Sequence, residues 1–579
     1  MNGDMANRSA SGWILTGVGA CVVLFASTIW FGRSQSRRSL EAWKARMIAR
    51  GEKFGIDELA PPPSTTSDTN LDRIISAFSA LERSSFNPGV YSALDFAAAG
   101  EARAPWSQTN LTATYGQKTT SWTQLTEEMD SVRENLDEIR SALEHPADTS
   151  IFNYHNFSPP NFVAQRVVAQ WLKCETIERL HAGDLAGAQA ALRPLTALTR
   201  LHQNDLLVAN LMIRVTIGGL DFEASWSALQ MPGWTEPRLA ELQSDWGRLK
   251  FLEKLSPTIE MERAHALEQF DYSLTNGLQR ARARSRMVFS ATTSKSGIRT
   301  FFEEHFLDPF WRIAWAEQDE LFYLESMQRH LDAIRNAQRH KSWAKFSGEL
   351  FPINSQINER MNGLGAFRHT LSGQFTIASF VRAYEYVMRQ ETQRSLMIAA
   401  VALKRYQLHF GKLPPHLESL TPEFLATVPV DYMNGQSLHY RLEPDGLFVL
   451  YSVGLDGKDD GGDPQPAVAW KPYTGLWDGR DAVWPRLATA AAGETAPAAE
   501  ILQLVKFDDA PLLDVIRTLA RQANLQVQID PKVLKQSFAP VRTYLENVTA
   551  EDVLKAILAN NNLVLVKHPG TNIVGITWK

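Results

Sequence analysis

The stretch ILQLVKFDDAPLLDVIRTLA, residues 501–520, decides how the last part of the chain folds. Its first residues alternate between apolar and polar, which is typical of a strand with one wet face. Asp509 then stands ahead of Pro511, a pairing common at the start of a helix. Leu512, Val515, Ile516 and Leu519 follow at helical spacing. The stretch therefore predicts a strand followed by an amphipathic helix.

The residues that follow repeat the same kinds of signal up to the end of the sequence. Alternating apolar residues predict strands at 525–529 and 541–545. Thr549 with Asp552 indicates a weak capping box, since Glu or Gln would be usual at the second position. Apolar residues at helical spacing come next, and two short runs, 563–566 and 573–578, end the chain. Residues 501–579 thus predict a small β-α-β-β-α-β-β domain.

Several motifs in this domain carry a resemblance to a known family. They are Phe507 to Leu512, Ile529-Asp530-Pro531 and Leu545 to Thr549. In this order they resemble the short N-terminal domain shared by secretins and TonB-dependent receptors. The resemblance implies a domain that binds other envelope or secretion-system proteins and has no catalytic residues. Because the sequence ends at Lys579, where a secretin would continue into its barrel, we expect no pore. An unrelated α+β domain with similar patterning is the alternative.

The composition of the whole chain is that of ordinary globular proteins. A length of 579 residues predicts about three or four domains. The apolar share of 44% and the charged share of 21% allow sizeable cores. A net charge of -5 gives no reason to expect a nucleic-acid partner. The two cysteines, Cys21 and Cys174, are not expected to form a disulfide.

A run without charged residues near the N-terminus predicts a transmembrane helix. It extends from Gly12 to Gly32 within residues 11–32, behind a short tail at 1–10. About 20 residues cross a bilayer as a helix, and Trp13 and Trp30 would lie at its two interfaces. A cleaved signal peptide and a lipoprotein modified at Cys21 are the alternatives.

The orientation of this predicted helix is ambiguous. Arg33, Arg37, Arg38, Lys44 and Arg46 follow it, which by the positive-inside rule favours a cytoplasmic body. The secretin-like resemblance favours the periplasm instead. We expect a single-pass inner-membrane protein whose soluble body is periplasmic.

Helical periodicity dominates the chain between the N-terminal region and residue 370. Residues 33–69 are expected to form a juxtamembrane segment and a proline-rich linker, and residues 70–370 an all-α domain. No His-Glu-x-x-His motif, phosphate loop or nucleophile elbow occurs. We therefore expect no catalytic residues and no enzyme.

Residues 371–485 predict a long helix followed by a small antiparallel sheet. Gly411-Lys412-Leu413-Pro414, Pro429-Val430-Asp431 and Tyr451 to Gly457 resemble the soluble part of a type II secretion major pseudopilin, over roughly residues 374–484. The long helix is interior to the chain and no prepilin-peptidase site precedes it, so we expect a borrowed fold. The whole layout also resembles uncharacterised anchored proteins of planctomycete and verrucomicrobial bacteria.

An acidic loop within this region is a candidate calcium site. Asp456, Asp459, Asp460 and Asp463 lie among glycines that could turn backbone carbonyl oxygens inward. In pseudopilins the equivalent loop holds calcium, and the resemblance therefore implies Asp459, Asp460 and Asp463 as calcium ligands. A polar loop without metal is the alternative. Residues 486–500, rich in alanine, then predict a flexible tether.

The predicted fold class is a multidomain α+β protein with a transmembrane helix, a large all-α domain, a pseudopilin-like domain and a small βαββαββ domain. The predicted function is protein–protein recognition by a membrane-anchored envelope protein, with residues 501–579 binding the partner. A hydrolase with a cleft in the helical domain and a structural envelope spacer are the alternatives. The sequence does not indicate an oligomeric state.

Overall fold

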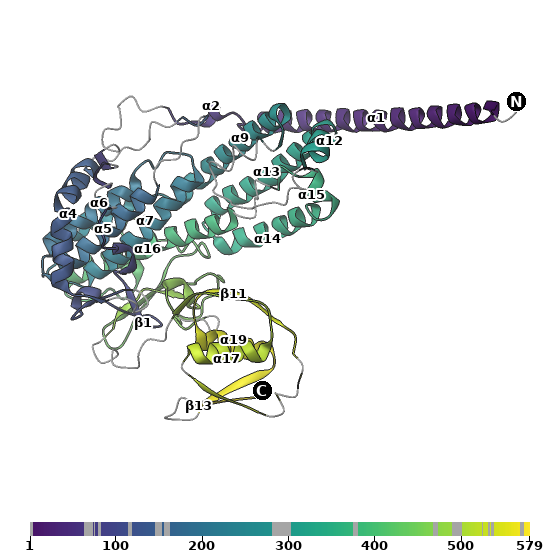
Figure 1. The fold of residues 1–579 in the computed structure, drawn as a ribbon. Helices are drawn as coiled ribbons and strands as arrows, with labels where there is room; N and C mark the ends of the chain where they lie inside the picture. The colour runs from purple at the N-terminus through teal and green to yellow at the C-terminus, as the bar shows by residue number, and fades with distance from the viewer. Residues whose placement is uncertain are drawn as a thin grey trace.

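The structure of this protein is a computed structural model. It describes residues 4–62 (4–19 as backbone only), 73–74, 76–78, 81, 83–113, 119–144, 153–155, 162–278, 280, 301, 303–373, 380–466, 473–488, 501–523, 525–530, 533, 536, 538–567 and 573–578. Most of these residues lie in a helical body, from which a long N-terminal helix projects, while a smaller αβ unit follows at the C-terminus (Figure 1). The predicted linker residues 63–69 and tether residues 489–500 lie outside the described residues.

The N-terminal helix α1 (Asp4–Ala49) is anchored to the body at its C-terminal end. Leu40, Trp43 and Met47 recur at helical spacing and are buried in the main core. The helix that they approach is α13 (Ala316–His340), and the end of α1 lies along it (Figure 1).

Two ion pairs flank this contact between α1 and α13. Arg33 Nε lies 2.9 Å from Glu317 Oε1, and Lys44 Nζ lies 2.5 Å from Glu320 Oε1. The basic residues that follow the predicted membrane segment therefore bind carboxylates of the body. This contact is a tertiary alternative to the lipid-headgroup role that the positive-inside rule assigns to such residues.

The transmembrane helix predicted at Gly12–Gly32 is contradicted by the structure. In the part of the chain whose side chains are described, no helix is both long enough and apolar enough to cross a bilayer. Arg33 follows without a break in the helix. The predicted fold class was therefore wrong in including a transmembrane helix. The predicted location, a single-pass inner-membrane protein with a periplasmic body, depended on that helix and is wrong as well.

The helical body consists largely of antiparallel neighbours joined by short connections. Figure 1 shows α4 to α7 and α16 side by side at one end, and α12 to α15 near α1 at the other. The helices before residue 370 are α2 (Ile56–Leu59), α4 (Trp122–Leu143), α5 (Phe162–His181), α6 (Leu185–Arg200), α7 (Val208–Leu229), α8 (Glu236–Gly247), α9 (Leu252–Asn276), α12 (Asp308–Ala314), α13, α14 (Trp343–Arg360) and α15 (Leu364–Arg368). Shorter turns are η1 (Pro88–Val90), η2 (Pro105–Ser107) and the π-helical η4 (Glu303–Leu307).

Local sequence signals explain where several of these helices begin and which face they bury. Ser121 caps α4 by accepting a hydrogen bond from Gln124 N at 3.1 Å, and Asp184 caps α6 by accepting one from Gly187 N at 2.8 Å. The apolar stripe of α4 is buried at every position from Leu125 to Leu143 where it recurs. Such stripes bury one face of each helix in a shared core.

The region predicted to be all-α also contains short strands. They are β1 (Asp95–Ala98), β2 (Glu101–Arg103), β3 (Leu111–Thr112) and β4 (Thr119–Thr120). Strand β2 pairs in parallel with β8 (Arg486–Leu487), which the sequence assigned to the flexible tether. The all-α prediction was therefore wrong here. Strands β1 and β2 form a local hairpin, β3 pairs with the nearby β4, and only the pairing of β2 with β8 joins segments far apart in the chain.

The pseudopilin-like region shares the core of the helical body. Helix α16 (Phe380–Phe410) packs against α7 and α8, and the sheet that follows has the order β5-β6-β7. Its strands are β5 (His439–Leu442), β6 (Phe448–Ser452) and β7 (Ala482–Val483), with turns η6 (Leu417–Leu420) and η7 (Leu476–Asp478). One continuous cluster of buried residues runs from Leu40 to Trp484. The predicted boundary at 370/371 thus does not separate two cores.

The C-terminal unit has a core of its own. Its elements are β9 (Ile501–Ala510), α17 (Leu512–Gln522), β10 (Gln526–Ile529), β11 (Val541–Thr549), α19 (Ala550–Asn560), β12 (Leu563–Lys567) and β13 (Ile573–Trp578). Strands β9 and β11 form an antiparallel pair, and a second sheet has the order β10-β13-β12. Residues of both helices and both sheets form the buried cluster, which includes Ile516, Leu519, Leu554 and Ile576.

The two predicted helix caps of this unit differ from expectation in their chemistry. Asp509 has a φ of 56° and binds Arg542 across the β9–β11 pair through two contacts of 2.7 Å. Thr549 does cap α19, since its hydroxyl accepts from Asp552 N at 3.1 Å. In a capping box the Asp552 carboxylate would accept a hydrogen bond from the backbone N–H of Thr549. Here it accepts one from the Thr549 hydroxyl instead, at 2.5 Å.

Candidate functional site

The four aspartates of the predicted calcium loop each bind their own surroundings. Asp456 Oδ1 accepts from Lys458 N at 3.0 Å, and Asp463 Oδ1 accepts from Gln465 N at 2.9 Å. Both are Asx turns, in which a carboxylate binds the backbone two residues on. Asp463 also accepts from Arg480 Nη1 at 3.1 Å.

The other two aspartates of the loop face different partners. Asp459 Oδ1 accepts from Gly461 N at 2.9 Å and from the Tyr451 hydroxyl at 3.0 Å; the Gly461 bond, followed by the smaller effect of Tyr451, lowers the pKa of Asp459. Asp460 contributes its backbone N–H to Asp481 at 3.4 Å. Among the described residues, no group of three or more His, Cys, Asp or Glu side chains could hold a metal. Calcium binding at Asp456, Asp459, Asp460 and Asp463 stays a prediction.

Two buried aspartates lie beside this loop, of which Asp481 binds the loop backbone and Asp431 binds the end of strand β6 that leads into it. Asp481 Oδ2 accepts from Gly462 N at 2.7 Å and from Asp463 N at 3.0 Å, and Asp431 accepts from Ser452 and Val453. Burial raises the pKa of both carboxyls, and these hydrogen bonds counteract it. Asp431 belongs to the Pro-x-Asp motif noted in the sequence, whereas no local signal marks Asp481.

The C-terminal unit presents strand edges to solvent. Within the described residues, β10 and β12 each pair only with β13, so each has one open edge. Val564 and Val566 of β12 are 37% and 46% exposed on the outer face, whereas Leu563 is buried on the inner one. Gly575 of β13 lies opposite Val566 and adds no side chain to this face. The outer face at β12 therefore presents two exposed valines, with Thr577 opposite Val564 and a glycine opposite Val566.

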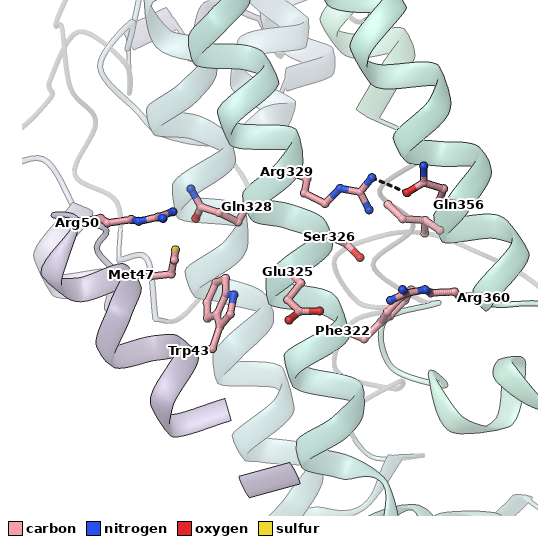
Figure 2. A pocket seen from close by; sticks show the side chains of 11 residues that line it. Trp43, Met47, Arg50, Phe322, Glu325, Ser326, Gln328, Arg329, Gln356 and Arg360 are labelled. Atoms are coloured by element: carbon pink, nitrogen blue, oxygen red, sulfur yellow. Dashed lines mark hydrogen bonds between the residues drawn. The ribbon is translucent and has the colours of Figure 1, made fainter. Parts of the chain in front are cut away.

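The helical body has a cleft on its surface. It lies between the end of α1, the middle of α13 and the end of α14, and has a volume of about 320 Å³ (Figure 2). Its floor consists of the buried side chains Trp43, Met47, Phe322, Ser326 and Ile357. These come from all three helices, so the floor exists only when α1 is docked.

The rim of the cleft is polar and rich in arginine. Arg50, Arg329 and Arg360 are exposed and surround the floor, and Arg329 Nη2 donates to Gln356 Oε1 at 2.8 Å (Figure 2). Glu325 is the carboxylate among the lining residues. An anion carrying an apolar group could bind here, because arginine supplies several N–H donors and the floor receives apolar surface.

A second hollow continues the cleft along α13. It has a volume of about 470 Å³ and shares Phe322, Glu325 and Arg360 with the first. Arg368 lines it and lies over the ring of Trp315, 6.0 Å from its centroid. His369 stacks on Phe322 with ring centroids 4.0 Å apart.

A buried network fixes the wall that α1 contributes to this cleft. Glu52, just after α1, accepts from Arg263 at 3.0 Å, from Gln328 at 2.9 Å and from Arg335 at 3.0 Å. Burial alone would raise the pKa of Glu52, but the hydrogen bonds from these three side chains outweigh it and lower that pKa to about 2. Because Gln328 also lines the cleft, the network couples the position of α1 to the shape of the site.

Sequence reasoning did not identify the cleft. Arg50, Arg329 and Arg360 lie far apart along the chain and resemble any exposed arginine at a helix end or on a helix face. Only the docking of α1 and α14 on α13 brings them together.

Comparison of the chain with family models, with curated proteins and with solved structures finds no match.

Proposed function

We propose that this protein acts by protein–protein recognition, with the C-terminal unit of residues 501–579 as the part that binds the partner. The supporting observation is that this unit has its own buried core and an open edge at β12, where Val564 and Val566 are exposed. A strand edge offers unpaired backbone N–H and C=O groups to an incoming strand.

The composition of β12 favours this edge as the docking site. Natural edge strands are commonly protected by charges or prolines. From Leu563 to Val566 this strand carries neither, and its first charged residue is Lys567. Two exposed valines next to a glycine would receive the side chains of an added strand, since side chains of neighbouring strands contact one another on each face.

The proposed partners are secretin-type or other envelope and secretion-system proteins, as the resemblance of residues 507–558 implies. Their surfaces would supply one extended segment to pair with β12. The hydrolase alternative has no supporting constellation in the described cleft, whose lining gathers arginines around one carboxylate. The spacer alternative predicts no loss of function when residues 501–579 are deleted.

Crosslinking in the source cells tests the recognition proposal. The full chain carrying an affinity tag is compared with Val564→Glu/Val566→Glu, which places charges on the exposed face without touching the buried one. A matched control, Arg517→Glu, alters a 61% exposed side chain of the same unit. We expect secretion-system or receptor proteins to be captured by the original chain and the control, and lost with the double variant. Recovery of the same proteins with all three chains contradicts the proposal.

A further inference from the structure

The cleft between α1, α13 and α14 concentrates positive charge in a chain whose net charge is -5. Its two hollows are lined by four arginines, Arg50, Arg329, Arg360 and Arg368, against the single carboxylate of Glu325. The cleft is thus positively charged although the whole chain is negatively charged. This favours an anionic ligand, because complementary charge steers a ligand to its site and selects against ligands of the same charge as the site.

The arginines of the rim are available to a ligand. In the described part of the chain, neither Arg50 nor Arg360 has an ion-pair partner, and Arg329 binds only the neutral amide of Gln356. Many other arginines of the body are neutralised, as Arg263 and Arg335 are by Glu52. The cleft therefore keeps guanidinium groups whose charge no nearby carboxylate cancels, apart from that of Glu325.

The floor adds a requirement for apolar groups. Trp43 and Phe322 are each 7% exposed, and Met47 and Ile357 are each 5% exposed, so the small surface that they retain faces the hollow. A purely ionic ligand such as free phosphate would leave this surface wet. A ligand with apolar side chains would cover it and gain affinity from the apolar surface removed from water.

The length of the cleft suits a peptide. The two hollows together extend along α13 from Gln318 to Arg329, which at 1.5 Å per residue is about 16 Å. An extended chain rises about 3.3 Å per residue, so about five residues would fill this length. The arginines of the rim, Arg50, Arg329, Arg360 and Arg368, are exposed and can be reached from solvent.

We propose that this cleft binds an extended acidic segment of a partner protein, with its apolar side chains on the floor and its carboxylates on Arg50, Arg329, Arg360 and Arg368. Binding at this site is separate from recognition through the C-terminal sheet. Glu325 lies between the arginines and repels the ligand, so it limits affinity and excludes segments with too few apolar side chains.

Fluorescence anisotropy of a labelled peptide of alternating glutamate and leucine, titrated with the full chain, tests the proposal. The variant Arg329→Glu/Arg360→Glu is expected to weaken binding by about tenfold or more, because each change replaces an attraction with a repulsion. The matched control Lys345→Glu/Arg517→Glu makes the same change of charge at exposed sites outside the cleft and should stay within about twofold of the original chain. Glu325→Gln should strengthen binding. Circular dichroism and urea unfolding of every variant show that the exposed substitutions leave the fold intact.

Other probes separate this ligand from its competitors. Binding should weaken when salt rises from about 50 to about 500 mM. Peptides with lysine in place of glutamate, or glycine in place of leucine, should bind more weakly. Equal loss in both double variants, or equal binding of the lysine peptide, overturns the proposal. Variant-sensitive binding to phosphatidylglycerol vesicles without binding of the acidic peptide also overturns it, in favour of a lipid surface. The Val564→Glu/Val566→Glu chain should bind the peptide normally, which distinguishes failure at this site from failure of the C-terminal sheet.

Discussion

Replacing Glu52 with glutamine tests how α1 is held on the helical body. The glutamine has nearly the same shape but no charge. It leaves Arg263, whose side chain is 0% exposed, without a carboxylate partner. The remaining contacts are neutral: the oxygens of Gln328 at 2.7 Å and Lys53 at 2.8 Å, the ring of Phe54 at 4.5 Å, and the amide oxygen of the new glutamine. Arg335 keeps its contact with Glu260 at 2.9 Å. The change therefore creates one uncompensated buried cation.

Two independent routes give the same magnitude for this change. Removing one partner of a buried ion pair costs about 3–5 kcal/mol. The pKa of Glu52, about 2 against an ordinary 4.5, corresponds to about 3 kcal/mol. Because Arg335 is 35% exposed and water screens part of the interaction, we expect a loss of about 2–3 kcal/mol at neutral pH.

The pH dependence has a definite sign. Since folding lowers the pKa of Glu52, its contribution is fully present above the unfolded pKa of 4.5 and is lost as pH falls toward about 2. The difference in unfolding free energy between the original chain and Glu52→Gln should therefore stay constant above about pH 5 and shrink below it.

Urea unfolding followed by circular dichroism at pH 7 and pH 3 measures both effects. Glu41→Gln is the matched control in the preceding helix α1, because Glu41 is 64% exposed and pairs with the exposed Arg37. Its cost should stay under about 0.5 kcal/mol. The reasoning is refuted if Glu52→Gln costs no more than this control at pH 7, or if its cost is the same at both pH values.

Three further changes test other parts of the structure. Burial raises the pKa of Asp221 to about 7 despite hydrogen bonds from Thr196 and Ser225, so this group makes folding less favourable as pH rises from about 4 to about 7. Asp221→Asn should remove up to about 4 kcal/mol of that decline, which urea unfolding at the two pH values measures. Leu554→Ala should lower the stability of the C-terminal unit by about 2–5 kcal/mol and leave the stability of the helical body unchanged, because the two have separate cores. Hydrogen exchange measures the protection of each region separately, and a loss of protection that is uniform over the chain would contradict separate cores. Calcium binding at the acidic loop predicts that added calcium raises the melting temperature and that Asp459→Asn reduces the shift, whereas an unchanged melting temperature with and without calcium rejects the site.

Local sequence patterns located many elements because their causes are local. The stripe of Leu512, Val515, Ile516 and Leu519 lies on one face of α17, whatever else the chain does. The long helix before Gly411 likewise ends at Phe410, where the glycine has a φ of 71° and prolines follow. The prediction of a membrane helix was wrong. A count of uncharged residues does not reveal that the same helix continues through Arg33 and packs against α13.

The cleft could not be predicted in the same way. Arg50, Arg329 and Arg360 become neighbours only through packing of three helices, and their exposure is a property of that packing. The acidic loop shows the converse, since the carboxylates of Asp456, Asp459 and Asp463 are close in sequence yet accept hydrogen bonds from separate partners. Proximity along the chain does not make side chains converge.

The sequence by itself determined which segments are helical or extended and where several of them begin, because hydrogen bonds and apolar periodicity act over a few residues. Only the tertiary structure decided that residues 371–485 join the core of the body, that β8 pairs with β2, and that α1 forms one wall of an arginine-lined cleft. Those outcomes depend on which apolar surfaces bury one another, and this choice is made between segments hundreds of residues apart.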